Sequence, residues 1–281
     1  MIYDNLTVKE IKKLLRERDM PVTGKKSELI DKLLGISTGS KNIYELENRI
    51  SKTEKRHQVS IVILSWKRVE NIYKILNSYE SLEIVSEIII WNNNPEINLI
   101  KTSKTKIINS SEDFGMRTRF AAGLFVKNDC IIFHDDDTLL PHITIKGLYL
   151  EWLKNPNIMH GLWGCIPKDD GSYSLYLDPP AKVDMIVGRC MVLRSQYCRE
   201  FFLIEKDHPA PDDHSALNGC EDILMSYMIM SNTGKKNQCH LFEHIDLPYG
   251  NAICRRPNHY TQRTDFMQRC KIWLDGIKSN N

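Results

Sequence analysis

The stretch Cys130-Ile131-Ile132-Phe133-His134-Asp135-Asp136-Asp137-Thr138 decides how this chain is expected to fold. Its apolar half, 130–134, is short and uninterrupted, which is typical of a strand buried on both faces of a sheet. Three aspartates follow directly, and in open α/β sheets ligands bind beyond the carboxyl ends of the strands. Three adjacent carboxylates repel one another unless a cation or several donors compensate them. The stretch therefore predicts a buried strand with a cation site at its end.

Hard divalent ions such as Mg²⁺ or Mn²⁺ favour a few carboxylates together with substrate phosphate oxygens and water. An apolar strand that leads into Asp-x-Asp is thus the layout expected of a metal–diphosphate site. The competing interpretation is a solvated acidic turn that caps a helix beginning near Pro141. The rest of the chain has to decide between the two.

The segments before this strand repeat its pattern. Apolar runs at 59–64, 88–91 and 106–108 predict three further strands, and helical spacing at 71–76 and 116–126 predicts helices between them. Strands that alternate with helices indicate a mostly parallel sheet with helices on both faces. The fold class expected of residues 58–281 is therefore α/β.

Residues 1–35 stand apart from this domain. Apolar side chains at 8, 11, 14 and 15 have helical spacing, and Thr7 with Glu10 has the arrangement of a capping box. A second short helix is expected from Lys25 to about Leu34, before Gly35. Residues 36–57 are polar and predict a linker, with a helix from 42 to about 52.

The N-terminal pair of helices resembles the SAP motif, a small DNA-binding module, over residues 4–35. The most specific matching part is Thr23-Gly24-Lys25-Lys26, between the two helices. Lys25 and Lys26 at a helix N-terminus would add charge to backbone donors suited to phosphate, so the resemblance implies that they contact DNA. The alternative is a helical pair that docks on protein, because residues 1–35 carry eight basic and six acidic side chains, a net charge of only +2.

Composition limits the function classes. The 281 residues are 42% apolar and 26% charged, with a net charge of +2, which is ordinary for a globular protein and does not announce nucleic-acid binding. No apolar run approaches the roughly 18 residues that span a bilayer, and the N-terminus lacks the pattern of a secretory signal. The eight cysteines are scattered singly, which favours buried free thiols. We therefore expect an intracellular protein, in the cytoplasm or nucleus, without a membrane partner.

From about residue 58 to 275 the chain resembles the C-terminal catalytic domain of exostosins and exostosin-like proteins. The matching stretches fall in the family's order: Ser65-Trp66-Lys67-Arg68, Ile90-Trp91-Asn92-Asn93, Arg117-Thr118-Arg119-Phe120, Asp135-Asp136-Asp137-Thr138-Leu139, Val187-Gly188-Arg189-Cys190-Met191, Cys220-Glu221-Asp222-Ile223-Leu224-Met225, and Arg256-Pro257-Asn258-His259 with Gln262-Arg263. The resemblance implies a GT-A fold and retaining transfer of a sugar, N-acetylhexosamine or hexose, from a UDP-sugar with Mn²⁺ or Mg²⁺.

The resemblance also implies a role for each site residue. Asp137 would be the direct metal ligand, with Asp135 and Asp136 near the ribose and diphosphate and Asp135 and His259 as further candidates for the metal shell. Arg68, Asn92 and Arg119 would contact the donor, where a guanidinium fork suits phosphate. Asp222 would stand beside the anomeric carbon and Arg263 would stabilise charge on the leaving UDP. For Asp222, an ordinary helix cap is the competing interpretation.

Two positions depart from the family's pattern. Phe114 stands where an Asn is expected in the donor pocket, and Phe266 stands where a Cys would pair with Cys220. The family disulfide is therefore expected to be absent, which fits a reducing compartment. Three further interpretations stay open: an acceptor that is a cytosolic protein or glycan, an inactive DNA-tethered domain that binds nucleotide-sugar, and nucleotidyl transfer by two-metal chemistry.

Overall fold

The computed structural model describes residues 7–17, 21–26, 28–29, 58–170, 172, 179–205, 219–248, 250 and 257–279. The helix predicted within the linker, 42–52, lies outside these residues. The chain divides into two compact units, Met1–His57 and Gln58–Asn281.

In the first unit, helix α1 (Val8–Glu17) begins at the predicted capping box. The Thr7 backbone N–H donates to Glu10 Oε2 at 2.7 Å, and the Glu10 N–H donates to Thr7 Oγ1 at 3.4 Å. Ile11 and Leu15 are buried and Val8 is exposed, so the apolar face is narrower than predicted. Gly24 has a φ of +131°, and a Cβ there would meet Glu28 Oε2 at 2.6 Å, so the turn requires glycine.

The two lysines predicted to contact DNA, Lys25 and Lys26, are exposed. The Lys25 backbone N–H donates to Glu28 Oε2 at 2.9 Å. The Glu28 carboxylate therefore already accepts from one backbone donor of this turn.

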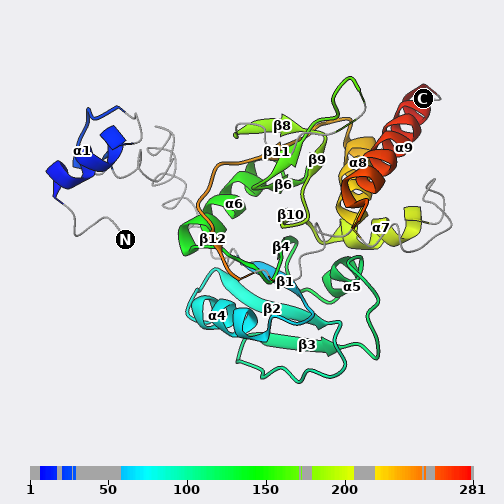
Figure 1. Ribbon diagram of the computed structural model, residues 1–281, viewed down its shortest axis with the longest axis horizontal. Coiled ribbons are helices and arrows are strands. Elements are labelled where there is room, and N and C mark those ends of the chain that lie inside the picture. Colours follow the sequence, from blue (N-terminus) through cyan, green and yellow to red (C-terminus); the bar gives the residue numbers. More distant parts are fainter. Residues whose placement is uncertain are drawn as a thin grey trace. The chain divides into compact units, whose positions relative to one another are not determined.

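The second unit is built on an eight-stranded sheet with the order β3-β2-β1-β4-β10-β6-β11-β8 (Figure 1). The predicted strands are present, with bounds that extend the apolar runs by a few residues: β1 (Val59–Ser65), β2 (Val85–Asn92), β3 (Thr105–Asn109) and β4 (Cys130–His134). These four pair in parallel. The others in the sheet are β6 (His160–Gly161), β8 (Ala181–Val183), β10 (Cys190–Arg194) and β11 (Asn237–Cys239), of which β10 and β8 run antiparallel to their neighbours. The sheet is thus mostly parallel, as expected.

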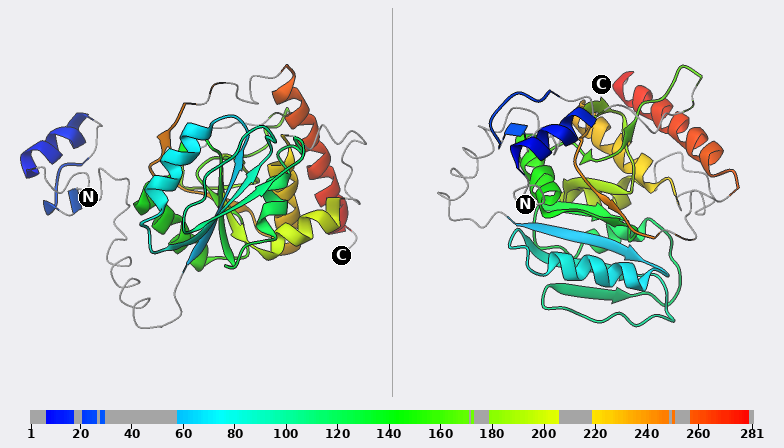
Figure 2. Two further views of the ribbon diagram at one scale, coloured as in Figure 1. Left: turned by 90° about the horizontal axis from the view of Figure 1, so that it is seen from below. Right: turned by 60° about the vertical axis from the view of Figure 1, so that its left-hand side comes forward.

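Alternating side chains of the strands bury two separate cores. Ile61, Ile63 and Ile132 face α4 (Val69–Tyr79) and α6 (His142–Lys154). Val62, Ile131 and Phe133 face the other core, which is filled by α5 (Thr118–Gly123), α7 (Gln196–Glu205), α8 (Glu221–Thr233) and α9 (His259–Ser279). In the left view of Figure 2 the sheet runs between α4 and the pair α8 and α9. Within the described residues, no helix is both long and apolar enough to cross a membrane.

The direction of β10 determines which residues lie beside the end of β4. Because β10 is antiparallel to β4, its first residue, Cys190, pairs with the last residue of β4, His134. The turn before β10 therefore lies beside the acidic residues that follow β4. Beyond them, β5 (Thr138–Leu139) pairs with β12 (Ile245–Asp246), and two more short strands, β7 (Gly164–Cys165) and β9 (Met185–Ile186), pair with each other.

The predicted helix over 116–126 is shorter than expected. It is α5, Thr118–Gly123, and Leu124 and Phe125 beyond it are exposed. Gly123 allows the close approach of α7, because a Cβ there would lie 2.4 Å from Cys198 Sγ. The observed helix α5 is thus the part of the predicted segment that packs against β1, β2 and α7.

Candidate functional site

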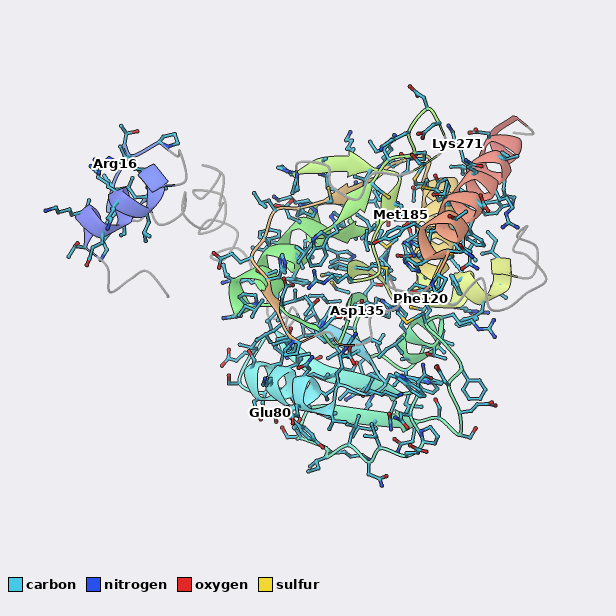
Figure 3. The ribbon with its side chains drawn as sticks, viewed as in Figure 1. Arg16, Glu80, Phe120, Asp135, Met185 and Lys271 are labelled. Carbon is cyan, nitrogen blue, oxygen red and sulfur yellow. The ribbon has the colours of Figure 1, made fainter. Side chains whose placement is uncertain are left out.

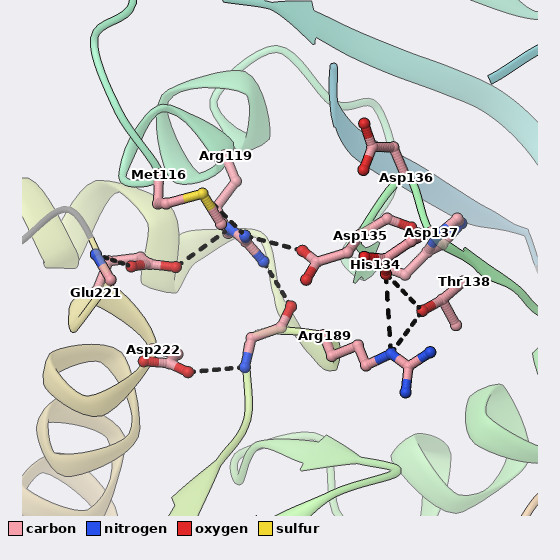
Figure 4. A network of polar contacts seen from close by, with 12 residues as sticks. Met116, Arg119, His134, Asp135, Asp136, Asp137, Thr138, Arg189, Glu221 and Asp222 are labelled. Carbon is pink, nitrogen blue, oxygen red and sulfur yellow. Dashed lines mark hydrogen bonds and ion pairs between the residues drawn. The ribbon is translucent and has the colours of Figure 1, made fainter. Parts of the chain in front are cut away.

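The acidic residues after β4 form a tight loop. The Asp135 N–H donates to the Arg189 carbonyl at 3.1 Å, and the Thr138 N–H donates to the Asp135 carbonyl at 3.2 Å. Asp135 lies toward the middle of the second unit (Figure 3). Figure 4 shows that the three carboxylates diverge: Asp135 points toward Arg119, whereas Asp136 points away from it.

Asp136 and Asp137 share one arginine. Arg68 occupies the N-cap position of α4 soon after β1, without a side-chain cap hydrogen bond, and its Nη1 donates to Asp136 Oδ1 and lies 3.1 Å from Asp137 Oδ2. Arg189 Nε lies 3.9 Å from the other oxygen of Asp137. The sequence prediction that Arg68 lies at this site is therefore consistent with its geometry, and here its guanidinium contacts the two aspartates.

Arg119 is only 2% exposed, and its guanidinium contacts three groups of the protein. Its Nη2 donates to Asp135 Oδ1 at 3.0 Å and its Nη1 to the Gly188 carbonyl at 2.5 Å. Its Nε lies 3.4 Å from Glu221 Oε1, an ion pair without hydrogen-bond alignment. Arg119 thus joins the acidic loop to the start of α8, as the dashed lines of Figure 4 show.

Asp222 and Arg263 form a bidentate buried ion pair. Arg263 Nη1 donates to Asp222 Oδ1 at 3.0 Å and Nη2 donates to Oδ2 at 2.9 Å. Two backbone donors complete the carboxylate: the Ile223 N–H at 2.9 Å from Oδ1 and the Gly188 N–H at 2.8 Å from Oδ2. Asp222 is 2% exposed and Arg263 6%. The two residues predicted to be catalytic therefore lie together, one at the start of α8 and one on α9.

Gly188 connects this pair to the acidic loop. Its N–H donates to Asp222 and its carbonyl accepts from Arg119. A Cβ at this position would lie 3.2 Å from Arg119 Nη1 and 3.3 Å from Asp222 Oδ2, so only glycine admits both side chains without displacement. A continuous path of polar contacts runs from Asp135 through Arg119 and Gly188 to Asp222.

Asn92 lies at the end of β2, as predicted, but its amide is used within the protein. Its Nδ2 donates to the Ile97 carbonyl at 2.7 Å and to Asn109 Oδ1 at 3.1 Å, and its Oδ1 accepts from the Asn94 N–H at 3.1 Å. The side chain is fully buried. In this structure it shapes the loop after β2, and its contact with a donor stays a prediction.

The proposed metal shell is less compact than the sequence suggested. His259 begins α9 with its ring against Tyr260, at 5.2 Å between centroids. Among the described residues, no three His, Cys, Asp or Glu side chains gather closely enough to hold a metal ion by themselves. Asp135, Asp137 and His259 do not form such a group in this geometry, and their role as metal ligands stays a prediction. Two carboxylates with substrate phosphate oxygens remain chemically suitable, because Mg²⁺ sites commonly use one or two carboxylates and phosphates.

The electrostatics of the acidic loop favour a cation. Burial raises the pKa of Asp136 to about 7, although Arg68 opposes the shift. Burial and then the neighbouring Asp135 raise the pKa of Asp137. The carboxylate forms are thus disfavoured by desolvation and by one another, and a bound dication would relieve both effects.

Three residues of the site were not singled out from the sequence. Gly188 and Arg189 belong to a stretch that matched the exostosin pattern, but nothing in the sequence indicated that they lie between two acidic groups. Glu221 precedes Asp222 and is 2% exposed, and burial raises its pKa against the opposing effect of Arg119. Its position beside Asp222 was the only signal that could have indicated it.

Known proteins are similar to both parts of the chain, in sequence or in fold. Residues 2–35 match the sequence model of the SAP domain. Among solved structures, a crystal structure of GalNAc-T7 with UDP, GalNAc and Mn²⁺ is similar, with a TM-score of 0.56 and 12% sequence identity over 79% of this chain. The match spans 50% of that protein's chain, and at this identity it shows the fold alone, a GT-A fold. Comparison with curated proteins finds no match.

The match that covers most of the chain is to a sequence family. Residues 59–277 match the glycosyl transferase family 64 domain, which takes in the whole sheet, the acidic loop, Asp222 and Arg263. This chain therefore belongs to glycosyl transferase family 64.

Proposed function

We propose that the protein transfers a sugar from a UDP-sugar to an acceptor hydroxyl, with retention of configuration, in a reaction that depends on Mn²⁺ or Mg²⁺. The observation that carries the proposal is the path of contacts from Asp135 through Arg119 and Gly188 to the Asp222–Arg263 pair. It joins a group suited to a metal–diphosphate with a carboxylate and an arginine suited to the reacting sugar. The GT-A fold and the family are consistent with this division.

In this proposal, Asp137 and Asp135 hold the dication together with the diphosphate of the donor. When bound, the ion would act as a Lewis acid that neutralises negative charge on the leaving diphosphate. Arg68 exchanges its present contacts with Asp136 and Asp137 for the donor phosphates, since guanidinium groups bind phosphate in a fork geometry. Arg119 fixes the orientation of Asp135 from behind.

Asp222 supplies fixed negative charge near the anomeric carbon. Its four donors, two of them from Arg263, hold the carboxylate in one orientation, and a preorganised carboxylate stabilises developing positive charge without reorganisation. Arg263 stabilises charge on the departing UDP. The proposed sugar is an N-acetylhexosamine or a hexose, which rests on the exostosin resemblance of the motifs around these residues.

A screen of UDP-sugars with Mn²⁺, which measures released UDP with and without candidate acceptors, tests this function. Asp137→Ala should abolish transfer and metal-dependent UDP binding. Asp129→Ala is the matched control, because Asp129 immediately precedes the same strand at its other end and its side chain is 45% exposed. UDP binding that is indifferent to EDTA and to Asp137→Ala would refute the metal–diphosphate site.

We further propose that the SAP domain holds the enzyme on DNA, so that the acceptor lies on or near DNA. The exposed Lys25 and Lys26 support this, because cations at a helix N-terminus bind phosphate. Replacing both lysines with Glu in the full chain should weaken DNA binding and reduce the slope of log K against log salt by about 2. The control replaces Lys154 and Lys235, exposed residues of the second unit. Unchanged DNA affinity in the first variant would remove DNA targeting while leaving the transferase function intact.

A further inference from the structure

Arg189 occupies a position that the proposed function does not yet use. It stands in the turn before β10, next to Gly188, and its side chain runs toward the acidic loop (Figure 4). Its Nε donates to Thr138 Oγ1 at 2.9 Å and lies 3.9 Å from Asp137 Oδ1. Its backbone carbonyl accepts from Asp135. One residue therefore holds the acidic loop at both ends.

The same guanidinium reaches strand β12. Arg189 Nη2 pairs with Asp246, and the next residue of the chain, Leu247, donates its N–H to the Asp137 carbonyl at 2.8 Å. The β12 strand thus contacts Arg189 through Asp246, and the residue after the strand contacts the acidic loop through its backbone, in addition to the pairing of β12 with β5.

Two aromatic rings restrict the orientation of the Arg189 side chain. The guanidinium carbon lies 4.5 Å from the centroid of the Trp163 ring, and the His244 ring packs edge-on against that indole at 4.6 Å. A planar cation stacked on an indole loses much of its rotational freedom. Arg189 is therefore held in one orientation although its side chain is 29% exposed.

The backbone on the other side of Arg189 leads to the second acidic group. Gly188 donates to Asp222 and accepts from Arg119, so the two-residue turn contacts Asp222 on one side and Asp135, Asp137 and Thr138 on the other.

We propose that Arg189 is a positioning residue that sets the separation between the Asp135–Asp137 loop and Asp222. The inference rests on the proposed function, in which the loop holds the metal–diphosphate and Asp222 faces the reacting sugar. Donor binding needs the loop, in which Arg119 also holds Asp135, and Arg68, which then contacts the donor phosphates. Turnover also needs the Asp135–Asp137 loop and Asp222 at the correct distance from each other, and a misplacement of about 1 Å can lower the rate roughly 100-fold.

Arg189→Met is the test, because methionine keeps an unbranched apolar stem over Trp163 and removes the donors. We expect kcat for sugar transfer to fall by roughly 10- to 100-fold, while the Kd of UDP with Mn²⁺ changes by less than about threefold. Arg194→Met is a matched control. Arg194 is at the other end of the same strand, its side chain is 31% exposed, and it pairs with Asp129. We expect its kcat to stay at the wild-type value.

Two further variants separate positioning from charge. Arg189→Lys keeps the charge but loses the fork, so it should not restore kcat. Asp246→Asn removes the partner on β12, and we expect a fall in kcat that is not additive with Arg189→Met. Full rescue by lysine, or a wild-type kcat in Arg189→Met, would overturn the inference.

A measurement that does not need turnover distinguishes this inference from the proposed function. If the wild-type chain shows no transfer with any UDP-sugar, the proposed function fails. The positioning role is then judged from hydrogen exchange, where the Gly188 and Leu247 amides should exchange faster in Arg189→Met than in Arg194→Met. Equal exchange in the two variants would overturn it.

Discussion

The Asp222–Arg263 pair provides a sharp test of the energetics of this site. Arg263→Met removes the cation and leaves a carboxylate that is 2% exposed. The backbone N–H groups of Gly188 and Ile223 still donate to it, but the two charge-assisted hydrogen bonds at 2.9 and 3.0 Å are lost. The variant therefore tests whether this carboxylate depends on the arginine.

Removing one partner of a buried ion pair costs about 3–5 kcal/mol, because the remaining charge stays desolvated. The two remaining backbone donors place Arg263→Met at the lower end, near 3 kcal/mol. For a domain of this size each kcal/mol shifts the melting temperature by roughly 2–4 °C, so we expect a decrease of about 6–12 °C.

Scanning calorimetry and urea unfolding of the full chain measure this loss. Arg194→Met serves again as the comparison, since its ion pair with Asp129 is 31% and 45% exposed and should contribute about 0–1 kcal/mol. If Arg263→Met lowers the free energy of unfolding by no more than Arg194→Met, then Asp222 is not held as a desolvated anion, and its assignment as a fixed negative charge fails.

Three further predictions concern other buried groups. His240 lies 2.9 Å from His160 in a buried pair, and burial lowers the pKa of both, that of His240 to about 3. Protonation of these histidines therefore favours the unfolded chain. The free energy of unfolding is highest above about pH 6.5 and falls by roughly 1.4 kcal/mol per pH unit per histidine as the pH drops toward the folded pKa. In urea unfolding, the difference between pH 7 and pH 5.5 should be smaller in His240→Gln than in the wild-type chain. Tyr79→Phe should lower the free energy of unfolding by about 1–3 kcal/mol, because the buried Leu140 N–H loses its acceptor at 2.9 Å; an unchanged urea midpoint would contradict this. Gly188→Ala should reduce kcat with little change in stability, since the neighbouring side chains need to move by only tenths of an ångström; an unaltered kcat would show that Asp222 tolerates the displacement.

The sequence predicted the central strands well because their signal is local. β1, β2 and β4 are buried on both faces, and such strands are nearly continuous runs of Ile, Val and Phe. The short strands β5, β7, β9 and β12 have two residues each, which is too short for any hydrophobic period, so no pattern could reveal them. Their pairing depends on contacts between residues far apart in the chain.

The site was predictable only where chemistry coincides with a strand end. Asp135–Asp137 and Arg68 follow buried strands and were placed at the site directly. The separate roles of Asp222 and Arg263 came from the exostosin resemblance, but their pairing was not predicted, since 41 residues separate them and no spacing rule links them. Arg119 is buried and contacts Asp135, Gly188 and Glu221, which no local pattern indicated, and its contact with a donor stays a prediction. Arg189 was not identified as a site residue. It lies beside the acidic loop because β10 pairs antiparallel with β4, and the pattern of alternating strands and helices did not predict an antiparallel strand there.

The location of Arg263 on α9 has a consequence for shortened forms of the enzyme. A protein cut between β12 and α9 keeps the strands of the sheet and the acidic residues but lacks the guanidinium that pairs with Asp222. Limited proteolysis within that connection should therefore switch off sugar transfer together with the cooperative melting of the catalytic unit. We therefore expect a fragment of the catalytic unit that lacks α9 to be unable to hydrolyse the donor.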